Sequence, residues 1–363
     1  MIHFITTRAR ALGMTVAGES ALPVMLSRWE NGRVEVTDPG YRRLFREFYG
    51  RTNEELGFPP EPQNESAEEL RDRLTVARSI DSETLDLFQR QVNDLRASDQ
   101  HFGAIVVLDQ LNNLVRQMES VRAFSVRPQH RERLAAILTD ARTLAGWTAL
   151  DRGSQLQAWQ YHEDAKVSAR EADSPYLLAH AVAQQAVILL DIGEPAAAVE
   201  LIEYARHIAE NRAPSLLRSW LAAAHGEGLA ATGNRSASLR TFDEARLLLP
   251  SHPIDPELPF LLMNDGHLAR WRGSALLRLE SHDTIKNLTA AAHELDSSPR
   301  GAIRGQLSMY VDLAFAYAAA GSRTEALDYV RKAKQLASRI GSDRQQRRLA
   351  KFELADPEVP RVM

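Results

Sequence analysis

The fold of this chain is decided by a repeated spacing of small residues, which is clearest in the stretch Gly321-Ser-Arg-Thr-Glu-Ala326-Leu-Asp-Tyr-Val-Arg-Lys-Ala333. An alanine follows the glycine after five residues, and a second alanine follows the first after seven. The first alanine, or its substitute, recurs with a period of about 40, at Ala158, Ala198, Ser238, Ile285 and Ala326. The spacing is loosest in the fourth unit, at Glu280, Ile285 and Ala292.

A second series of small residues lies twelve positions before each of these, at Gly146, Ala186, Gly226, Gly273 and Ala314. Small residues that face each other across a turn let two helices approach closely, as helix–turn–helix repeats that share a core require. The sequence therefore predicts an all-α chain with an α-solenoid of about five helical pairs. The alternative is an ordinary helical domain whose helices are rich in alanine.

The repeat pattern resembles tetratricopeptide repeats, lengthened from that family's 34 residues to about 40. The expected units are 131–172, 176–211, 214–250, 258–297 and 302–340, and proline, serine or glycine marks the breaks between them.

Composition places the chain among ordinary soluble proteins. It has 363 residues, 44% of them hydrophobic and 25% charged, and a formal net charge of −4, so global charge demands neither nucleic acid nor an anionic membrane. It has no cysteine, which excludes disulfides and thiolate chemistry. The sequence offers no apolar run of about twenty residues and no signal-peptide core, so we expect a cytoplasmic protein without a membrane partner.

Residues 1–58 are expected to form a small helical domain. Its string Leu26-Ser-Arg-Trp-Glu-Asn-Gly32 resembles the end of the recognition helix in Cro/repressor-type helix-turn-helix domains. In that family the recognition helix lies in the major groove of DNA. The resemblance implies that Trp29 is a core anchor and that the DNA-contacting residues are Ser27, Arg28, Arg33, Arg42 and Arg43.

One departure from that family makes this helix-turn-helix degenerate. The family places a separate helix between its first helix and the helix with the tryptophan, whereas only Thr15 to Ser20 is available here. The domain either binds DNA in a shortened form or is a vestigial cap without that activity.

The remaining boundaries follow from composition and phase. A proline-rich linker is expected over 59–75, capping helices over 76–128, the repeats over 129–342 and a charged tail over 343–363. The arginines of the tail, Arg344, Arg347 and Arg348, are expected to lie in solvent.

Taken in order, the chain is similar to actinobacterial regulators that join a Cro/repressor-type domain to tetratricopeptide-like repeats. The stretch Leu144-Ala-Gly-Trp-Thr-Ala-Leu-Asp-Arg-Gly153 is typical of their first repeat. The resemblance implies a transcriptional regulator that binds DNA and senses a peptide, small molecule or protein partner. Since many DNA readers dimerise to match two half-sites, analogy also suggests a homodimer. The alternative is an interaction scaffold that does not bind DNA.

The repeat phase identifies residues on the inner face of the solenoid, which the first helix of each pair lines. The ligand-binding candidates on this face are His180, Gln184, Trp220, Glu227, His267 and Trp271. Aromatic rings mixed with hydrogen-bonding groups suit an apolar ligand with a few polar handles, or an extended peptide. The alternative is that the tryptophans belong to the core between repeats and that the histidines are satisfied or solvated.

Nothing in the sequence points to an enzyme. The chain has no His-Glu-x-x-His motif, no glycine-rich phosphate loop and no nucleophile elbow, so we expect no catalytic residue, metal site or cofactor. The cluster His162-Glu163-Asp164 is interpreted as a solvated helix face rather than a metal site.

Overall fold

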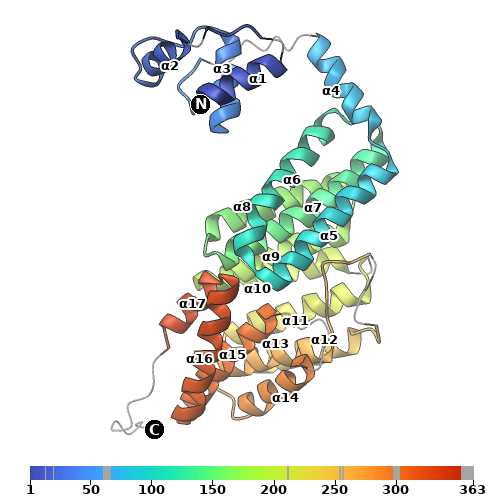
Figure 1. The fold of residues 1–363 in the computed structure, drawn as a ribbon. Coiled ribbons are helices and arrows are strands. Elements are labelled where there is room, and N and C mark those ends of the chain that lie inside the picture. Colours follow the sequence, from blue (N-terminus) through green and yellow to red (C-terminus); the bar gives the residue numbers. More distant parts are fainter. Residues whose placement is uncertain are drawn as a thin grey trace. The chain divides into compact units, whose positions relative to one another are not determined.

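The structure, a computed structural model, describes residues 1–12, 14–18, 20–59, 67–210, 212–252, 255, 257–296 and 303–352. Within these residues the chain forms 17 α-helices and no strand (Figure 1), which confirms the all-α prediction. The chain divides into two compact units, Met1–Asp72 and Arg73–Met363. Each unit has its own hydrophobic core.

The first unit is built from three helices, α1 (Ile2–Ala11), α2 (Leu22–Glu30) and α3 (Pro39–Tyr49). Ile5, Leu22 and Leu44 are fully buried between them. The Trp29 ring lies 4.8 Å from that of Tyr41, so Trp29 is a core anchor as predicted. No helix forms between α1 and α2 in the described residues of that segment, which is where the family's second helix is missing.

Polar caps fix the ends of the segments in this unit. Asp38 accepts a hydrogen bond from the Tyr41 amide and caps α3, which begins at Pro39. Thr52 and Glu55 exchange the two hydrogen bonds of a capping box, at 2.9 and 3.2 Å. The residues after Thr52 form a turn.

A helix replaces much of the predicted linker. Residues 60–66 lie outside the described residues, and α4 (Ala67–Ser79) is helical where an irregular segment was expected up to residue 75. Its glutamate-, leucine- and arginine-rich sequence has good helix propensity, which the prolines of 59–62 do not oppose beyond their own positions.

The second unit begins with two long helices, α5 (Ser82–Phe102) and α6 (Ala104–Phe124), which pack on the first repeat. Five helical pairs follow, as the small-residue spacing predicted. They are α7 (Pro128–Asp151) with α8 (Gln155–Glu171), α9 (Pro175–Ile192) with α10 (Pro195–Ala209), α11 (Ser215–Ala231) with α12 (Arg235–Leu248), α13 (Asp265–Arg278) with α14 (Thr284–Asp296), and α15 (Ile303–Ala319) with α16 (Arg323–Ile340). The last helix is α17 (Asp343–Ala350).

In the first, third and fourth helical pairs a glycine on the first helix meets a large side chain on the second. A Cβ atom at Gly226 would come within 2.7 Å of the Phe242 ring, and one at Gly146 within 2.6 Å of His162. The close approach also lets Ser238, which replaces the anchor alanine, donate a 2.7 Å hydrogen bond to the Gly226 carbonyl. The small-residue series therefore marks helix contacts, as expected.

The fourth pair is out of the predicted register by one residue. Thr284, Leu288 and Ala291 are its buried positions, while the expected anchor Ile285 is only partly buried. The turn of this pair also differs, since five residues join α13 to α14 and only three join α7 to α8 or α15 to α16.

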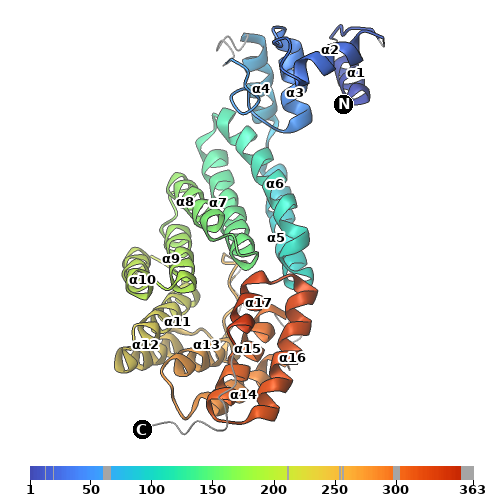
Figure 2. The ribbon, with the colours of Figure 1, turned by 90° about the vertical axis from the view of Figure 1, so that its left-hand side faces the viewer.

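The second unit curls so that its two ends meet. Figure 2 shows α10 and α12 on the outer side of α9 and α11, with α17 facing the inner side. Both α15 and α7 contact α17, and α16 contacts α5. The pairs therefore form a closed helical-repeat turn whose inner face is lined by α7, α9, α11, α13 and α15.

One described helix, α9, is long and apolar enough to cross a membrane by length and composition. Half of it is buried within the solenoid, between α8, α10 and α11. Its apolar character is that of a core helix in a repeat protein, and the expected cytoplasmic location stays a prediction.

Candidate functional site

A row of rings lies on the inner helices α9, α11 and α13. The ring centroids of His180 and Trp220 are 5.2 Å apart, and those of Trp220 and Trp271 are 5.8 Å apart. Phe260, from the connection between α12 and α13, stacks on His180 at 4.4 Å. Gln184 joins the row through His180, with their two Nε2 atoms 3.1 Å apart. The structure thus brings four of the six predicted ligand-face residues together.

His180 is an uncharged member of this row. Burial lowers its pKa to about 3, and its electrostatic interactions with His162 and Arg96 act in the same direction. At neutral pH a neutral ring accepts the Gln184 amide hydrogen bond at Nε2 and carries its proton on Nδ1. The His180 ring therefore behaves as an aromatic surface with a polar edge.

Burial divides the two tryptophans. Trp220 is only 7% exposed and belongs to the core that joins α9, α11 and the segment before α13, as the alternative interpretation expected. Trp271 is partly exposed and packs on the edges of two neighbouring clusters. Of the pair, Trp271 is the one that a ligand on the inner face can reach.

The other two predicted residues are not members of this row of rings. His267 takes part in the cap of α13, where the Asn264 side chain accepts a 2.9 Å hydrogen bond from its amide and lies 2.6 Å from its Nδ1. Burial lowers the pKa of His267 to about 4. Glu227 lies 3.8 Å from Arg278. His267 is therefore a capping residue, and Glu227 is a surface acid near the row.

Arg270 is the feature of the inner face that sequence reasoning missed. Its guanidinium lies 5.8 Å from the Trp271 ring, and its Nε is buried with no hydrogen-bond partner among the described residues. Burial lowers its pKa, while the charges of Glu227 on α11 and Asp312 on α15 favour its charged form. The charges that act on it come from several inner helices, so the group faces the interior of the repeat turn.

The prediction of a solvated arginine tail is wrong for Arg344 and Arg348. Arg344 Nε forms an ion pair with Asp191 of α9 at 2.7 Å, and its guanidinium lies 5.7 Å from the Trp147 ring. Arg348 pairs with Asp312 of α15 at 2.7 Å. These charged side chains of the terminal helix are largely withdrawn from solvent because α17 docks on the inner helices, where Asp191 and Asp312 are their partners.

A second set of ion pairs joins the last repeat to the first. Arg304 on α15 pairs with both Asp99 on α5 and Asp151 on α7, and all three side chains are buried. Ser342 donates a 2.6 Å hydrogen bond to Asp151. Burial raises the pKa of Asp99, and the charge of Arg304 opposes that effect.

The five predicted DNA-contacting residues are in different situations. Ser27, Arg28 and Arg33 are exposed at the end of α2 and in the turn after it. Arg42 is partly buried and donates a 2.6 Å hydrogen bond from Nε to the Val36 carbonyl, and Arg43 pairs with Glu47 at 3.2 Å. Arg28 and Arg33 form no side-chain hydrogen bond or ion pair with another described residue, so they are the two available cations of the set.

The cluster at His162 is not the solvated face that was expected. His162 is 1% exposed, and its ring packs against Gly146 of the neighbouring helix. Burial lowers its pKa to about 3. In the part of the chain that the structure describes, no group of three or more histidine, aspartate or glutamate side chains is placed to hold a metal ion.

A cavity of about 520 Å³ lies elsewhere, at the edge of the solenoid between the first and second pairs. Its lining includes two basic and two acidic residues, Arg170, Arg212, Asp173 and Glu210. This mixed lining selects no particular ligand charge, and the candidate site remains the inner face.

One signal in the sequence could have revealed the contribution of Phe260. The connection 249–264 is longer than any other turn of the repeats and contains the apolar run Leu258-Pro-Phe-Leu-Leu-Met263. Arg270 sits directly beside the selected Trp271, but nothing in the sequence distinguishes an unpaired arginine from a paired one.

Comparison with known proteins supports the fold. No protein-family model and no curated protein sequence matches the chain. Among solved structures, the apo form of RapI is similar with a TM-score of 0.52 at 12% identity, covering 76% of this chain and 91% of that one. A Rap protein complexed with competence and sporulation factor gives a TM-score of 0.48 at 12% identity, covering 93% and 92%. The likeness to RapI establishes a tetratricopeptide-like helical-repeat fold.

Proposed function

We propose that this chain is an interaction protein whose inner face binds an extended peptide, or an extended segment of a partner protein, that carries a carboxylate. The observation that carries the proposal is Arg270, a largely desolvated guanidinium beside Trp271 without a hydrogen-bond partner at Nε in the described residues. Buried unpaired donors are rare in folded proteins because they cost free energy. A ligand carboxylate would satisfy the fork of donors that arginine presents.

The surroundings of Arg270 support a peptide over a small anion. Trp271 and the edge of His180 offer apolar surface, and Gln184 offers an amide within the same row. Repeat solenoids present extended concave surfaces that suit extended ligands. A single carboxylate anchor with flanking aromatic rings thus fits a peptide that lies along several repeats.

A library of random peptides with free carboxyl ends tests this proposal. The full chain is panned as wild type, as Arg270→Ala and as Arg272→Ala. Arg272 lies on the same helix but pairs with Asp243 at 2.6 Å on the outer side, so it is the matched control. We expect wild type and Arg272→Ala to retain peptides that are rich in acidic residues or that bind through their carboxyl terminus. The enrichment of these peptides should be at least tenfold lower with Arg270→Ala. Equal enrichment by all three proteins would reject the proposal.

A second candidate function is DNA binding by the first unit, within a transcriptional regulator as the sequence suggested. Arg28 and Arg33 favour it, because they are exposed and unpaired among the described residues and lie at the end of α2. The absent second helix and the engagement of Arg42 and Arg43 weigh against it. The scaffold alternative therefore has the stronger support, and dimerisation stays a prediction.

A salt titration separates the two candidates. Binding to the DNA upstream of its own gene is measured for wild type, for the double substitution Arg28→Ala/Arg33→Ala and for Arg51→Ala, whose side chain pairs with Glu55. A DNA-binding head predicts steep salt dependence that flattens in the double variant alone, because each lost phosphate contact reduces the slope by roughly one. Absence of binding at low salt would leave the head as a cap.

A further inference from the structure

The connection between the third and fourth helical pairs is unusual for this chain. Sixteen residues, 249–264, join α12 to α13, whereas the other connections within and between the five pairs have two to six. Long connections inside compact domains are uncommon and are usually functional. Residues 257–264 of this connection, which we call the strap, lie on the inner face.

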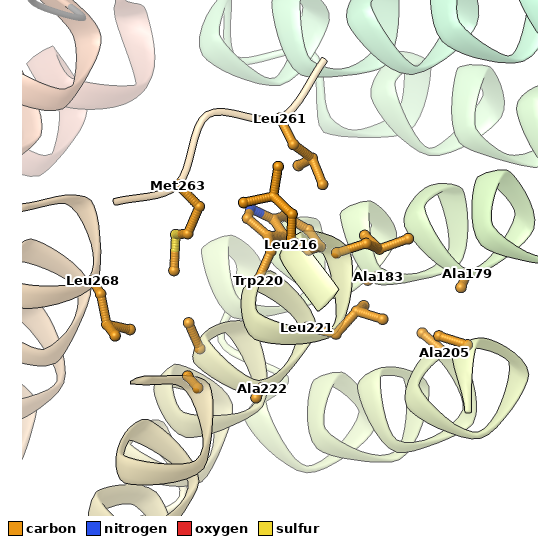
Figure 3. Close-up of a cluster of buried hydrophobic side chains, with 14 of the residues drawn as sticks. Ala179, Ala183, Ala205, Leu216, Trp220, Leu221, Ala222, Leu261, Met263 and Leu268 are labelled. Carbon is orange, nitrogen blue, oxygen red and sulfur yellow. The ribbon is translucent and has the colours of Figure 1, made fainter. Parts of the chain in front are cut away.

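The strap fills the inner face with apolar side chains. Leu258, Leu261 and Met263 are buried at 0%, 5% and 1% exposure, in one core cluster with Trp220 and Leu216 of α11. Figure 3 shows Leu261 and Met263 projecting from the strap over Trp220 and Leu216. The strap therefore covers apolar surface of α11 that would otherwise face the interior of the turn.

Phe260 places the strap in the predicted ligand site. Its ring stacks on His180 with centroids 4.4 Å apart and planes inclined by 27°. His180 and Trp220 occupy the same repeat position on α9 and α11, eighteen residues before Ala198 and Ser238, which the repeat phase assigns to the inner face. The strap and the aromatic row are consequently parts of one site.

The strap is held there by its side chains. Its backbone hydrogen bonds among the described residues are two turn bonds within the connection, from the Leu258 amide to the Asp255 carbonyl and from the Leu261 amide to the Leu258 carbonyl, both 2.9 Å, and one bond of 3.0 Å from the Leu268 amide of α13 to the Asn264 carbonyl at the end of the strap. None joins the strap to α9 or α11 in that part of the chain. Another extended segment with similar side chains can replace such a strap without breaking a hydrogen-bonded ladder.

We propose that the strap is an internal occupant of the peptide site, and that the ligand is an extended apolar segment whose aromatic side chain replaces Phe260 on His180. The strap leaves the site when such a ligand binds. The free energy of the strap's own contacts therefore subtracts from the binding free energy of the ligand. This inference rests on the proposed function, to which it adds the ligand class and the competing segment. The nearby Arg270 then takes the ligand's carboxylate.

The strap peptide itself is the probe. A fluorescein-labelled peptide with the sequence Glu-Leu-Pro-Phe-Leu-Leu-Met-Asn, copied from residues 257–264, is titrated with full-length protein and followed by anisotropy. The proteins are wild type, Phe260→Ser, and the triple substitution Leu258→Ser/Phe260→Ser/Leu261→Ser, each checked for helicity by circular dichroism. A peptide with alanine in place of its phenylalanine is the matched control probe.

We expect the peptide to bind the triple variant at least tenfold more tightly than wild type, and the alanine probe to lose that gain. If the triple variant is unfolded, the test relies on Phe260→Ser, which leaves the buried Leu258, Leu261 and Met263 in place. This variant should still bind the peptide severalfold more tightly than wild type. Equal binding to wild type and folded variants, or none to any folded variant, would overturn the inference.

The two proposals can fail separately. Library peptides that depend on Arg270 but bind equally with and without strap substitutions would keep the proposed function and remove the strap from it. Strap-peptide binding by the variants, together with an unenriched library, would keep the site and show that the carboxylate-bearing ligand is wrong.

Discussion

Arg344 on the last helix and Asp191 on α9 form an ion pair of 2.7 Å across 153 residues of sequence. Both side chains are largely buried, at 18% and 12% exposure. Burial alone would raise the pKa of Asp191, but the charge and hydrogen bond of Arg344, with a further bond from Gln155, outweigh it and hold the pKa below its usual value. This pair closes the repeat turn over its own inner face.

Removing the Arg344 side chain should loosen that closure. Arg344→Ala leaves Asp191 with one fewer partner in a partly desolvated position, so we expect a loss of about 1–3 kcal/mol in the free energy of unfolding at neutral pH. Urea denaturation measures this loss. Arg331→Ala is the control, because Arg331 forms an exposed ion pair with Asp328, one turn earlier on the same helix. An unchanged stability in both variants would show that α17 is not held by its charges.

The same pair has a defined pH dependence. A carboxyl whose pKa is lowered by folding stabilises the folded state above its unfolded pKa, and the contribution is lost as the pH falls through the lower, folded value. For Asp191 the loss is expected only below pH 3.8, the ordinary value. Hydrogen exchange of α17 at pH 7 and pH 3 measures it. Protection at pH 3 equal to that at pH 7 would contradict the assignment.

As the pH falls, the buried histidines should begin to lower the stability of the fold at a higher pH than Asp191 does. Folding lowers the pKa of His180 from 6.5 to about 3, so below pH 6.5 the unfolded chain binds a proton that the folded chain does not. Stability therefore falls as the pH decreases, by about 1.4 kcal/mol for one such histidine between pH 7.5 and 5.5.

His180→Phe tests this dependence while keeping a ring against Phe260. We expect the variant to lose about 1.4 kcal/mol less than wild type over the same interval, measured by urea denaturation at both pH values. His207→Asn is the control, because that side chain is 80% exposed. A variant with the wild-type slope would place the acid sensitivity in other groups, such as His162 or His267.

Helix contact at Gly226 gives a prediction about packing. Alanine has the better helix propensity, yet its Cβ would lie 2.7 Å from the Phe242 ring, which is fully buried. Gly226→Ala should cost about 1–3 kcal/mol by overpacking. In a Phe242→Leu background the same change should cost much less, and a double-mutant cycle by thermal or urea unfolding measures the coupling. Additive effects would show that the two residues do not limit the approach of α11 and α12.

Independent folding of the first unit can be tested at Trp29. Trp29→Ala removes a ring that contacts Tyr41 and Phe45, so it should destabilise this unit by roughly 3 kcal/mol and leave the unfolding of the repeats unchanged. Differential scanning calorimetry would resolve the two transitions, with Val24→Ala as control because Val24 is 52% exposed. A matching fall in the repeat transition would show that the boundary after Asp72 does not separate folding units.

The sequence by itself determined the class of the fold and the contacts within each pair. Small residues such as Gly226 recur with one period because close helix approach leaves no room for a Cβ, so each one is visible as a local constraint. The same phase identified His180 and Trp220 as neighbours on successive inner helices, since they occupy one repeat position, and it placed Trp271 four residues further along the next inner helix on the same face.

Only the tertiary structure decided what meets that inner face. The curvature of the turn adds up small rotations over five pairs, and no local pattern records the sum. It brings Arg304 to Asp99 and Asp151, and it converts the arginines of α17 from an expected solvated tail into buried partners of Asp191 and Asp312. The tertiary structure also brings Phe260 against His180, because the apolar side chains of a long connection pack on whichever part of the folded surface removes them from water.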